Sequence, residues 1–146
     1  MKFTYWILIL FTAVAVSAGT DDIMGTWKTV SRVTSPWTGK LSYEPTFEFK
    51  GDGNNLTGML RMDGWPGDAP ISDGKIEGDK VTFSVTHQRD YRFGRNGQMY
   101  SHFPRIKATG RIHGNEMELT VVPVTSDPDG NEGDGRPFEM KETKIL

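Results

Sequence analysis

Two apolar strand faces in this sequence turn polar toward the connection between them. Residues 81–85 are apolar at alternate positions, and the same alternation continues into His87, Arg89 and Tyr91. Residues 106–112 alternate likewise, and extending that pattern backwards gives His102 and Tyr100. If the two strands pair as a hairpin, these side chains gather at one mouth of the sheet. The predicted ligand-binding residues are therefore His87, Arg89, Tyr91, Tyr100, His102, Arg105 and Trp65.

Polar groups that converge above an apolar interior are typical of a small-molecule pocket. Imidazole, guanidinium and phenol groups would donate hydrogen bonds and supply partial positive charge, which suits a carboxylate, a sugar or another polar head group. Trp37 and Trp65 on flanking loops would add stacking at the rim. The same residues also suit strand ends that simply emerge into solvent, and a bulge at Pro104 would reverse the parity of His102.

A catalytic interpretation uses the same histidines. His87 and His102, with a carboxylate from Asp90, Glu44 or Glu48, would suit acid–base chemistry because imidazole titrates near neutrality. The sequence holds no Gly-x-Ser-x-Gly motif and no cysteine, so no nucleophile motif accompanies them. We therefore assign no catalytic residue, and a histidine-dependent hydrolase or isomerase ranks below a binding protein.

An acidic loop invites comparison with a calcium site. Asp127, Asp129 and Asn131 alternate as EF-hand ligands do, but Glu132 and Phe138 stand where that motif requires Gly and Glu. The sequence therefore predicts a solvated turn here, no metal site and no cofactor.

The elements that would position these residues are short strands. Runs with period-two alternation are separated by Gly, Asn, Asp and Pro, and no apolar period of 3.6 persists for three turns. The predicted strands, seven or eight in number, cover residues 24–34, 44–50, 55–62, 71–76, 81–86, 99–112, 116–124 and 137–142. Because closing such a meander removes its exposed edges, we predict an all-β, antiparallel up-and-down barrel. An open or sandwich-like sheet is the alternative.

The opening of the first strand, Gly25-Thr26-Trp27, resembles the calycin group, which comprises lipocalins, fatty-acid-binding proteins and avidins. The stretches 55–58 and 74–79 are similar to small exported lipocalin-like domains of uncharacterised function. This resemblance implies that the tryptophan plugs one end of the barrel. It also implies that a basic residue of the last strand, Lys141 or Lys144, covers the tryptophan. The biotin pocket of avidins has no residue-by-residue match in this chain.

The first residues predict export. Lys2 precedes an apolar run from Tyr5 to Val16, and Val16-Ser17-Ala18 places small residues where a signal peptidase cleaves. The run is shorter than the roughly 20 residues that span a bilayer, so cleavage is expected rather than a membrane anchor. We predict a signal peptide over residues 1–18 and a single domain over residues 19–146, which is secreted or periplasmic and has no membrane span after cleavage.

Composition excludes several classes of protein. The chain has no cysteine, which excludes disulfides, thiol catalysis and thiolate metal sites. Its formal net charge of −2 comes from interspersed charges, with no basic run that would bind nucleic acid. The expected partner is a small molecule, and no feature of the sequence indicates an oligomeric state.

Three functions fit these observations. The leading hypothesis is an exported lipocalin-like binding protein for a small amphipathic or polar-headed ligand. The second is the histidine-dependent hydrolase or isomerase. The third is an envelope interaction or inhibitor protein whose barrel is filled by its own side chains. That third hypothesis predicts an interior occupied by Phe47, Phe49, Leu60, Phe83, Phe103 and Met117.

Overall fold

Short antiparallel strands dominate the computed structural model, which describes residues 20–30, 33–34, 41–43, 45–61, 68–86, 90–93, 97, 99–102, 105–126 and 131–145. One short helix, α1 (Thr20–Ile23), precedes the strands. The strands are β1 (Gly25–Thr29), β2 (Val33–Thr34), β3 (Leu41–Tyr43), β4 (Thr46–Asp52), β5 (Asn55–Arg61), β6 (Ala69–Glu77), β7 (Lys80–Thr86), β8 (Asp90–Phe93), β9 (Met99–His102), β10 (Arg105–His113), β11 (Glu116–Ser126), β12 (Glu132–Asp134) and β13 (Phe138–Ile145).

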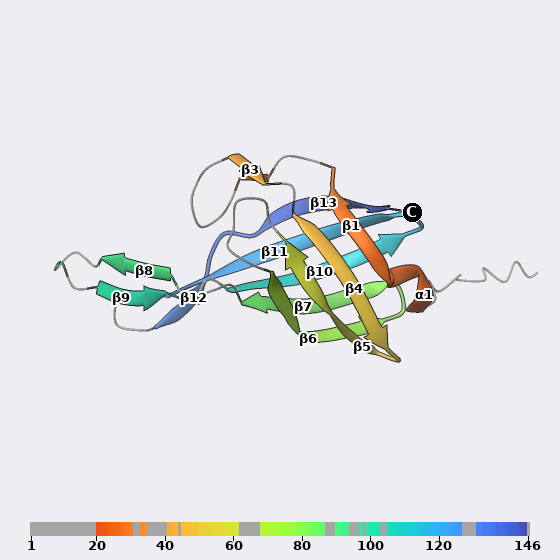
Figure 1. The fold of residues 1–146 in the computed structure, drawn as a ribbon, viewed down its shortest axis with the longest axis horizontal. Coiled ribbons are helices and arrows are strands. Elements are labelled where there is room, and N and C mark those ends of the chain that lie inside the picture. The colour runs from red at the N-terminus through yellow and green to blue at the C-terminus, as the bar shows by residue number, and fades with distance from the viewer. Residues whose placement is uncertain are drawn as a thin grey trace, which may run out of the picture.

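Eight of these strands form a closed barrel (Figure 1). In the order β1, β4, β5, β6, β7, β10, β11 and β13, each strand pairs antiparallel with the next, and β13 returns to pair with β1. The short β12 is added to β11 outside this ring. The prediction of an all-β, up-and-down barrel is confirmed, and the open or sandwich-like sheet is excluded.

Tight glycine turns join several of the neighbouring strands. Gly53, Gly78 and Gly114 have φ angles of 59°, 64° and 63°, in the left-handed region where a side chain is disfavoured. Each stands between two paired strands and is followed by Asn or Asp, a combination typical of tight turns. Local turn chemistry therefore fixes the register of three hairpins.

The inward positions of the barrel strands form one apolar core. Phe47, Phe49 and Phe83 are in mutual contact, with ring centroids 5.4 to 5.7 Å apart. The predicted core residues that the structure describes are all buried: Phe47, Phe49, Leu60, Phe83 and Met117. Phe103 lies outside the described residues. This part of the interior is filled by aromatic side chains.

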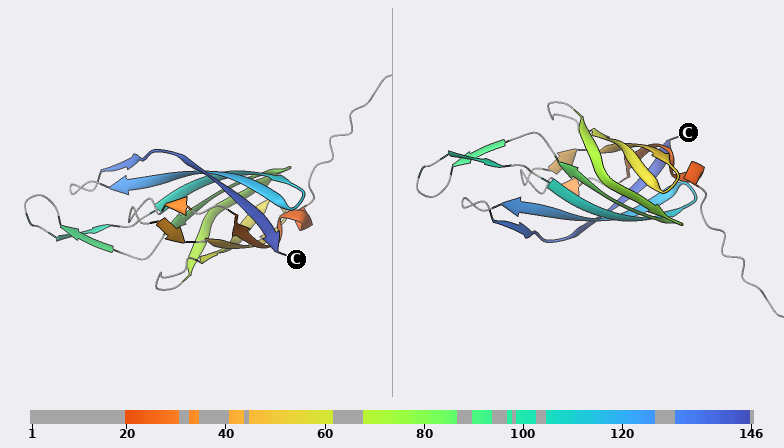
Figure 2. Two further views of the ribbon diagram at one scale, coloured as in Figure 1. Left: turned by 90° about the horizontal axis from the view of Figure 1, so that it is seen from above. Right: turned by 90° about the horizontal axis from the view of Figure 1, so that it is seen from below.

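One end of the barrel is covered by α1 (Figure 2). Trp27 is 0% exposed, and its indole N–H donates to the carbonyl oxygen of Ile23 at 2.9 Å. The Lys144 ammonium lies 5.9 Å from the centre of the Trp27 ring and donates to the carbonyl oxygen of Asp22 at 2.9 Å. Lys141 is exposed instead and lies 3.8 Å from Glu118. Of the two candidates, Lys144 is therefore the residue that covers the tryptophan.

We call the opposite end of the barrel the mouth. There β1, β5, β7 and β11 end, and β4, β6, β10 and β13 begin. Beyond the mouth, β8 and β9 form a separate two-stranded sheet that projects away from the barrel (Figures 1 and 2). Among the described residues, no helix is both long enough and apolar enough to cross a bilayer.

The strand limits differ from prediction at several places, three of which concern the first strand, the strand 99–112 and the acidic loop. The first strand ends at Thr29 rather than Thr34, because Val33–Thr34 pairs with β3 in its own small sheet. The predicted strand 99–112 is divided into β9 and β10, on either side of residues 103–104. Proline cannot donate a ladder hydrogen bond, which makes Pro104 the sequence feature at this division. The acidic loop contains one further strand, β12, which finds hydrogen-bond partners on β11.

The contacts of Lys144 predict a measurable contribution to stability. We expect Lys144→Ala to lower the free energy of unfolding by about 1–2 kcal/mol, because the substitution removes a cation–π contact and a hydrogen bond. Lys141→Ala on the same strand removes one exposed ion pair and should change stability by less than about 0.5 kcal/mol. Urea denaturation of both variants measures the difference, and equal effects would contradict the assignment.

Candidate functional site

The sequence-predicted site residues all belong to segments at the mouth. His87 and Arg89 follow the last residue of β7, and Trp65 lies in the segment that joins β5 to β6. These three residues lie outside the described part of the chain. Because β6 and β7 are adjacent, with Ile71 opposite Val85, both segments start from the same side of the mouth. Their convergence on a ligand stays a prediction.

The remaining histidine and tyrosines are placed by the backbone of the β8–β9 hairpin. Its register sets His102 opposite Asp90, and Tyr100 opposite Arg92. Tyr91 is paired with Ser101, so Tyr91 and Tyr100 do not occupy partnered positions. The side chains of both strands lie outside the described part of the structure. The hairpin brings a carboxylate and an imidazole residue to facing positions, away from the barrel wall.

Arg105 is the predicted site residue whose side chain the structure describes. It is the first residue of β10, and one guanidinium nitrogen bonds to Glu132 of β12 at 2.8 Å. Lys107 bonds to Asp134 of the same strand at 2.9 Å. These two ion pairs reach across β11 and connect β12, in the acidic loop, to β10. The guanidinium of Arg105, predicted to bind a ligand, therefore forms an ion pair within the protein.

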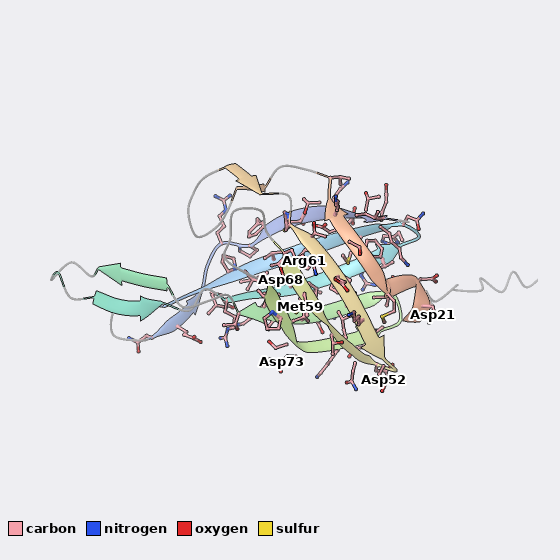
Figure 3. The ribbon with its side chains drawn as sticks, viewed as in Figure 1. Asp21, Asp52, Met59, Arg61, Asp68 and Asp73 are labelled. Atoms are coloured by element: carbon pink, nitrogen blue, oxygen red, sulfur yellow. The ribbon has the colours of Figure 1, made fainter. Side chains whose placement is uncertain are left out.

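The segment that carries Trp65 is anchored at its base. Arg61 ends β5 and Asp68 precedes β6, and their side chains form an ion pair at 3.0 Å (Figure 3). A second oxygen partner, Glu48, lies 3.5 Å from Arg61. All three side chains are at least partly exposed, so the pairs contribute little free energy. They do hold the two ends of the segment 62–67 together at the rim of the mouth.

The structure reveals a buried polar pair that the sequence interpretation missed. Among the described residues, the buried polar or charged side chains are Thr29 and Glu142. They face each other across the closing pair of strands, and Thr29 Oγ1 lies 2.7 Å from Glu142 Oε1. Thr29 Oγ1 also lies 3.0 Å from the carbonyl oxygen of Pro45. Thr29 is the last residue of β1, whereas Met117, the other partner of Glu142, is the second residue of β11, so the pair lies between the mouth and the end that α1 covers.

Burial determines the protonation state of Glu142. Its side chain is 1% exposed, and the loss of water raises the pKa of Glu142 from 4.5 to about 8, against the opposing effect of the hydrogen bond with Thr29. The carboxyl is therefore mainly protonated at neutral pH. Its second oxygen, Oε2, has no hydrogen-bond partner among the described residues. A buried polar atom without a partner is uncommon in folded proteins and requires an explanation.

A sequence signal for this residue exists. Phe138, Met140 and Glu142 share one face of β13, and the exposed residues Glu139 and Lys141 alternate with them. An apolar face that turns acidic at its third position would have marked Glu142 as an inward carboxyl.

A groove of about 510 Å³ lies on the outside of the barrel, over β10, β11 and β13. It runs between two rows of outward side chains and is lined by Thr109, Gly110, Arg111, Glu118, Leu119, Thr120, Glu139, Met140 and Lys141. It shares no predicted ligand-binding residue. Within the described residues, no group of three or more metal-ligating side chains is close enough to hold a metal ion.

Comparisons of this chain with protein-family models, with curated proteins and with solved structures find no match.

The raised pKa of Glu142 predicts a pH-dependent stability. Between pH 4.5 and 8 the folded chain holds a proton that the unfolded chain has lost, so stability decreases as pH rises through this window. The decrease from this group approaches about 1.4 kcal/mol per pH unit. Glu142→Gln, which cannot ionise, should flatten the profile, whereas Glu139→Gln on the outer face should leave it unchanged. Urea denaturation at pH 5, 6.5 and 8 measures this, and parallel profiles for the parent and Glu142→Gln would refute the burial argument.

Proposed function

We propose that this chain is an exported, lipocalin-like binding protein that holds a small amphipathic or polar-headed ligand at the mouth of its barrel. The proposal includes removal of residues 1–18 as a signal peptide and a secreted or periplasmic location for residues 19–146. The proposed partner is a small molecule and not a nucleic acid.

The end of the barrel that α1 covers supports the calycin resemblance. Gly25 opens the first strand with a φ of 125°, and Trp27 is buried two residues later. Lys144 of the last strand lies over the indole ring. The residues that the resemblance selects from the sequence therefore come together in space. A fold shared with binding proteins does not by itself define a function, so the argument depends on the mouth.

The observation that carries the proposal is the buried carboxyl among apolar inward residues. Toward the mouth, the buried inward positions of the barrel are apolar: Leu60, Ala69, Ile71, Val85, Ile106 and Met140. Ligand sites typically combine such a lining with a few well-placed polar groups. Thr29 and Glu142 supply one polar group, and His87, Arg89 and Trp65 are the predicted contributors from the segments above.

A filled barrel that acts through its outer surface is the second candidate. The contacts among Phe47, Phe49 and Phe83 favour it, because these rings occupy the interior where they meet. The outer groove over β10, β11 and β13 would then be a contact surface. The two candidates differ in whether the mouth half of the barrel admits a ligand.

Mass spectrometry of the natively purified chain tests the proposal. We expect a bound small molecule, released by organic extraction, with an apolar body and a polar head. Re-addition of the extract should raise the melting temperature of the stripped protein. An absence of bound molecules, together with no thermal shift across a panel of amphiphiles, would favour the filled barrel.

A substitution at Ala69 separates the same two candidates. Ala69 is buried at the mouth end of β6, so Ala69→Leu adds volume to the interior. In a ligand-binding barrel we expect weaker ligand binding at nearly unchanged stability. In a filled barrel, overpacking should cost about 1–3 kcal/mol of unfolding free energy. Ser72→Leu, at an exposed position of the same strand, is the matched control and should have neither effect.

A further inference from the structure

The β8–β9 hairpin forms a separate unit beyond the mouth. Its two strands pair with each other and, among the strands that the structure describes, with no strand of the barrel. The hairpin projects away from the barrel in each view (Figures 1 and 2). A two-stranded sheet by itself is only marginally stable in water and needs packing on one face. The residues on its two faces therefore indicate the kind of surface that would stabilise it.

The register of the hairpin separates apolar from charged residues. Directly opposite residues of an antiparallel pair lie on the same face, and the faces alternate along each strand. The observed pairs place two aromatic residues, a methionine and a serine on one face: Tyr91, Phe93, Met99 and Ser101. The other face holds two charged residues, a histidine and a second tyrosine: Asp90, Arg92, Tyr100 and His102. The hairpin is therefore amphipathic.

A change of register by one residue produces this separation. Thr86 pairs with Arg105 where the barrel ends. Three residues separate β7 from β8, but only two separate β9 from β10. If the register of the barrel continued, Tyr91 would stand opposite Tyr100. The shift sets Tyr91 opposite Ser101 instead, so the two tyrosines lie on different faces.

The segment that contains the hairpin is basic, although the chain is acidic. Residues 87–104 contain three arginines and one aspartate, whereas the whole chain has 17 basic and 19 acidic residues. One of these arginines, Arg92, lies within β8. An anionic surface attracts this segment and repels the acidic remainder of the chain. The protein would therefore approach such a surface with the hairpin first.

We propose that the β8–β9 hairpin docks the protein onto an anionic lipid membrane, with the face of Tyr91 and Phe93 in the headgroup region. Aromatic residues partition to this depth, and each arginine near an anionic leaflet adds attraction. The open edges of a two-stranded sheet carry backbone groups that need water, so the contact is shallow and does not span the bilayer. The inference goes beyond the proposed function and does not depend on a ligand at the mouth.

The same register disfavours single-stranded nucleic acid as the partner. Sites for single strands combine basic residues with several stacking aromatic residues in one groove. In this hairpin Tyr91 and Phe93 lie on the face opposite Arg92, which shares its own face with Tyr100 alone of the aromatic residues. Separate apolar and charged faces match a membrane interface, which is apolar on one side and wet on the other.

A dye at a single cysteine tests the proposal in the full chain. The chain has no cysteine of its own, so Ser101→Cys labels the apolar face alone, and Ser72→Cys labels the exposed outer wall of β6 as the control. Each carries an environment-sensitive nitrobenzoxadiazole dye. We expect the Ser101→Cys fluorescence to rise severalfold with vesicles of phosphatidylglycerol and phosphatidylcholine in equal parts. It should rise much less with phosphatidylcholine alone, and less in high salt.

Three outcomes of this titration would overturn the proposal. The first is an unchanged signal at Ser101→Cys, and the second is an equal rise at Ser72→Cys. The third is a rise without vesicles, either with protein concentration, which would assign the face to a second copy of the chain, or with single-stranded DNA. This comparison leaves the aromatic and charged residues of the hairpin intact.

Co-sedimentation of variants with the anionic vesicles tests the two faces. We expect Phe93→Ser to weaken binding about tenfold, because one aromatic side chain no longer leaves water. Arg92→Gln should weaken binding about fivefold, because it removes one positive charge near the anionic surface. Lys75→Gln removes the same charge from an exposed position toward the other end of β6 and should bind as the parent does. Equal losses for Arg92→Gln and Lys75→Gln, or full binding by Phe93→Ser, would contradict docking through the hairpin.

Discussion

Closure of the sheet through β1 and β13 is the constraint on which the other features of the barrel depend. β1 is only five residues long, yet it pairs with β4 on one side and β13 on the other. This double pairing buries Trp27 and brings Lys144 over its ring. It also sets Thr29 opposite Glu142, so a carboxyl from the last strand is enclosed by residues of the first. The acid would meet water if the sheet stayed open.

The fold was largely predictable because alternation carries the information about burial. Phe47, Phe49 and Phe83 have the period of a half-buried strand, and glycines such as Gly78 mark the turns. The limits of strands were less predictable. Residues 33–34 have strand-like side chains, but whether they extend β1 depends on which strand lies beside them. Local sequence does not encode where a pairing partner leaves the sheet.

Little of the candidate site is tested by the structure, because His87, Arg89 and Trp65 lie outside the described residues. The parity argument assigns His87 and Tyr100 to one end of the barrel, and this assignment stays a prediction. Arg105 was assigned to the same ligand site, and in the structure its guanidinium bonds to Glu132, in a loop predicted to be solvated. Glu142 lay outside this argument, although it continues the inward face of Phe138 and Met140 on β13. The pairing of Thr29 with Glu142 spans 113 positions, a distance over which sequence patterns carry no register.

The same closing pair gives the chain the connectivity of a ring. Thr26 lies opposite Ile145, so the first and last barrel strands are neighbours. Every other pairing within the barrel joins two barrel strands that follow one another in the sequence. A ring of sequential hairpins has no intrinsic first strand. A circular permutant that joins the two ends by a short linker and opens at the exposed Gly78 turn would keep each strand beside the same neighbours. The non-local contact would then pass to β6 and β7. Which strand is synthesised first is therefore separable from the architecture itself.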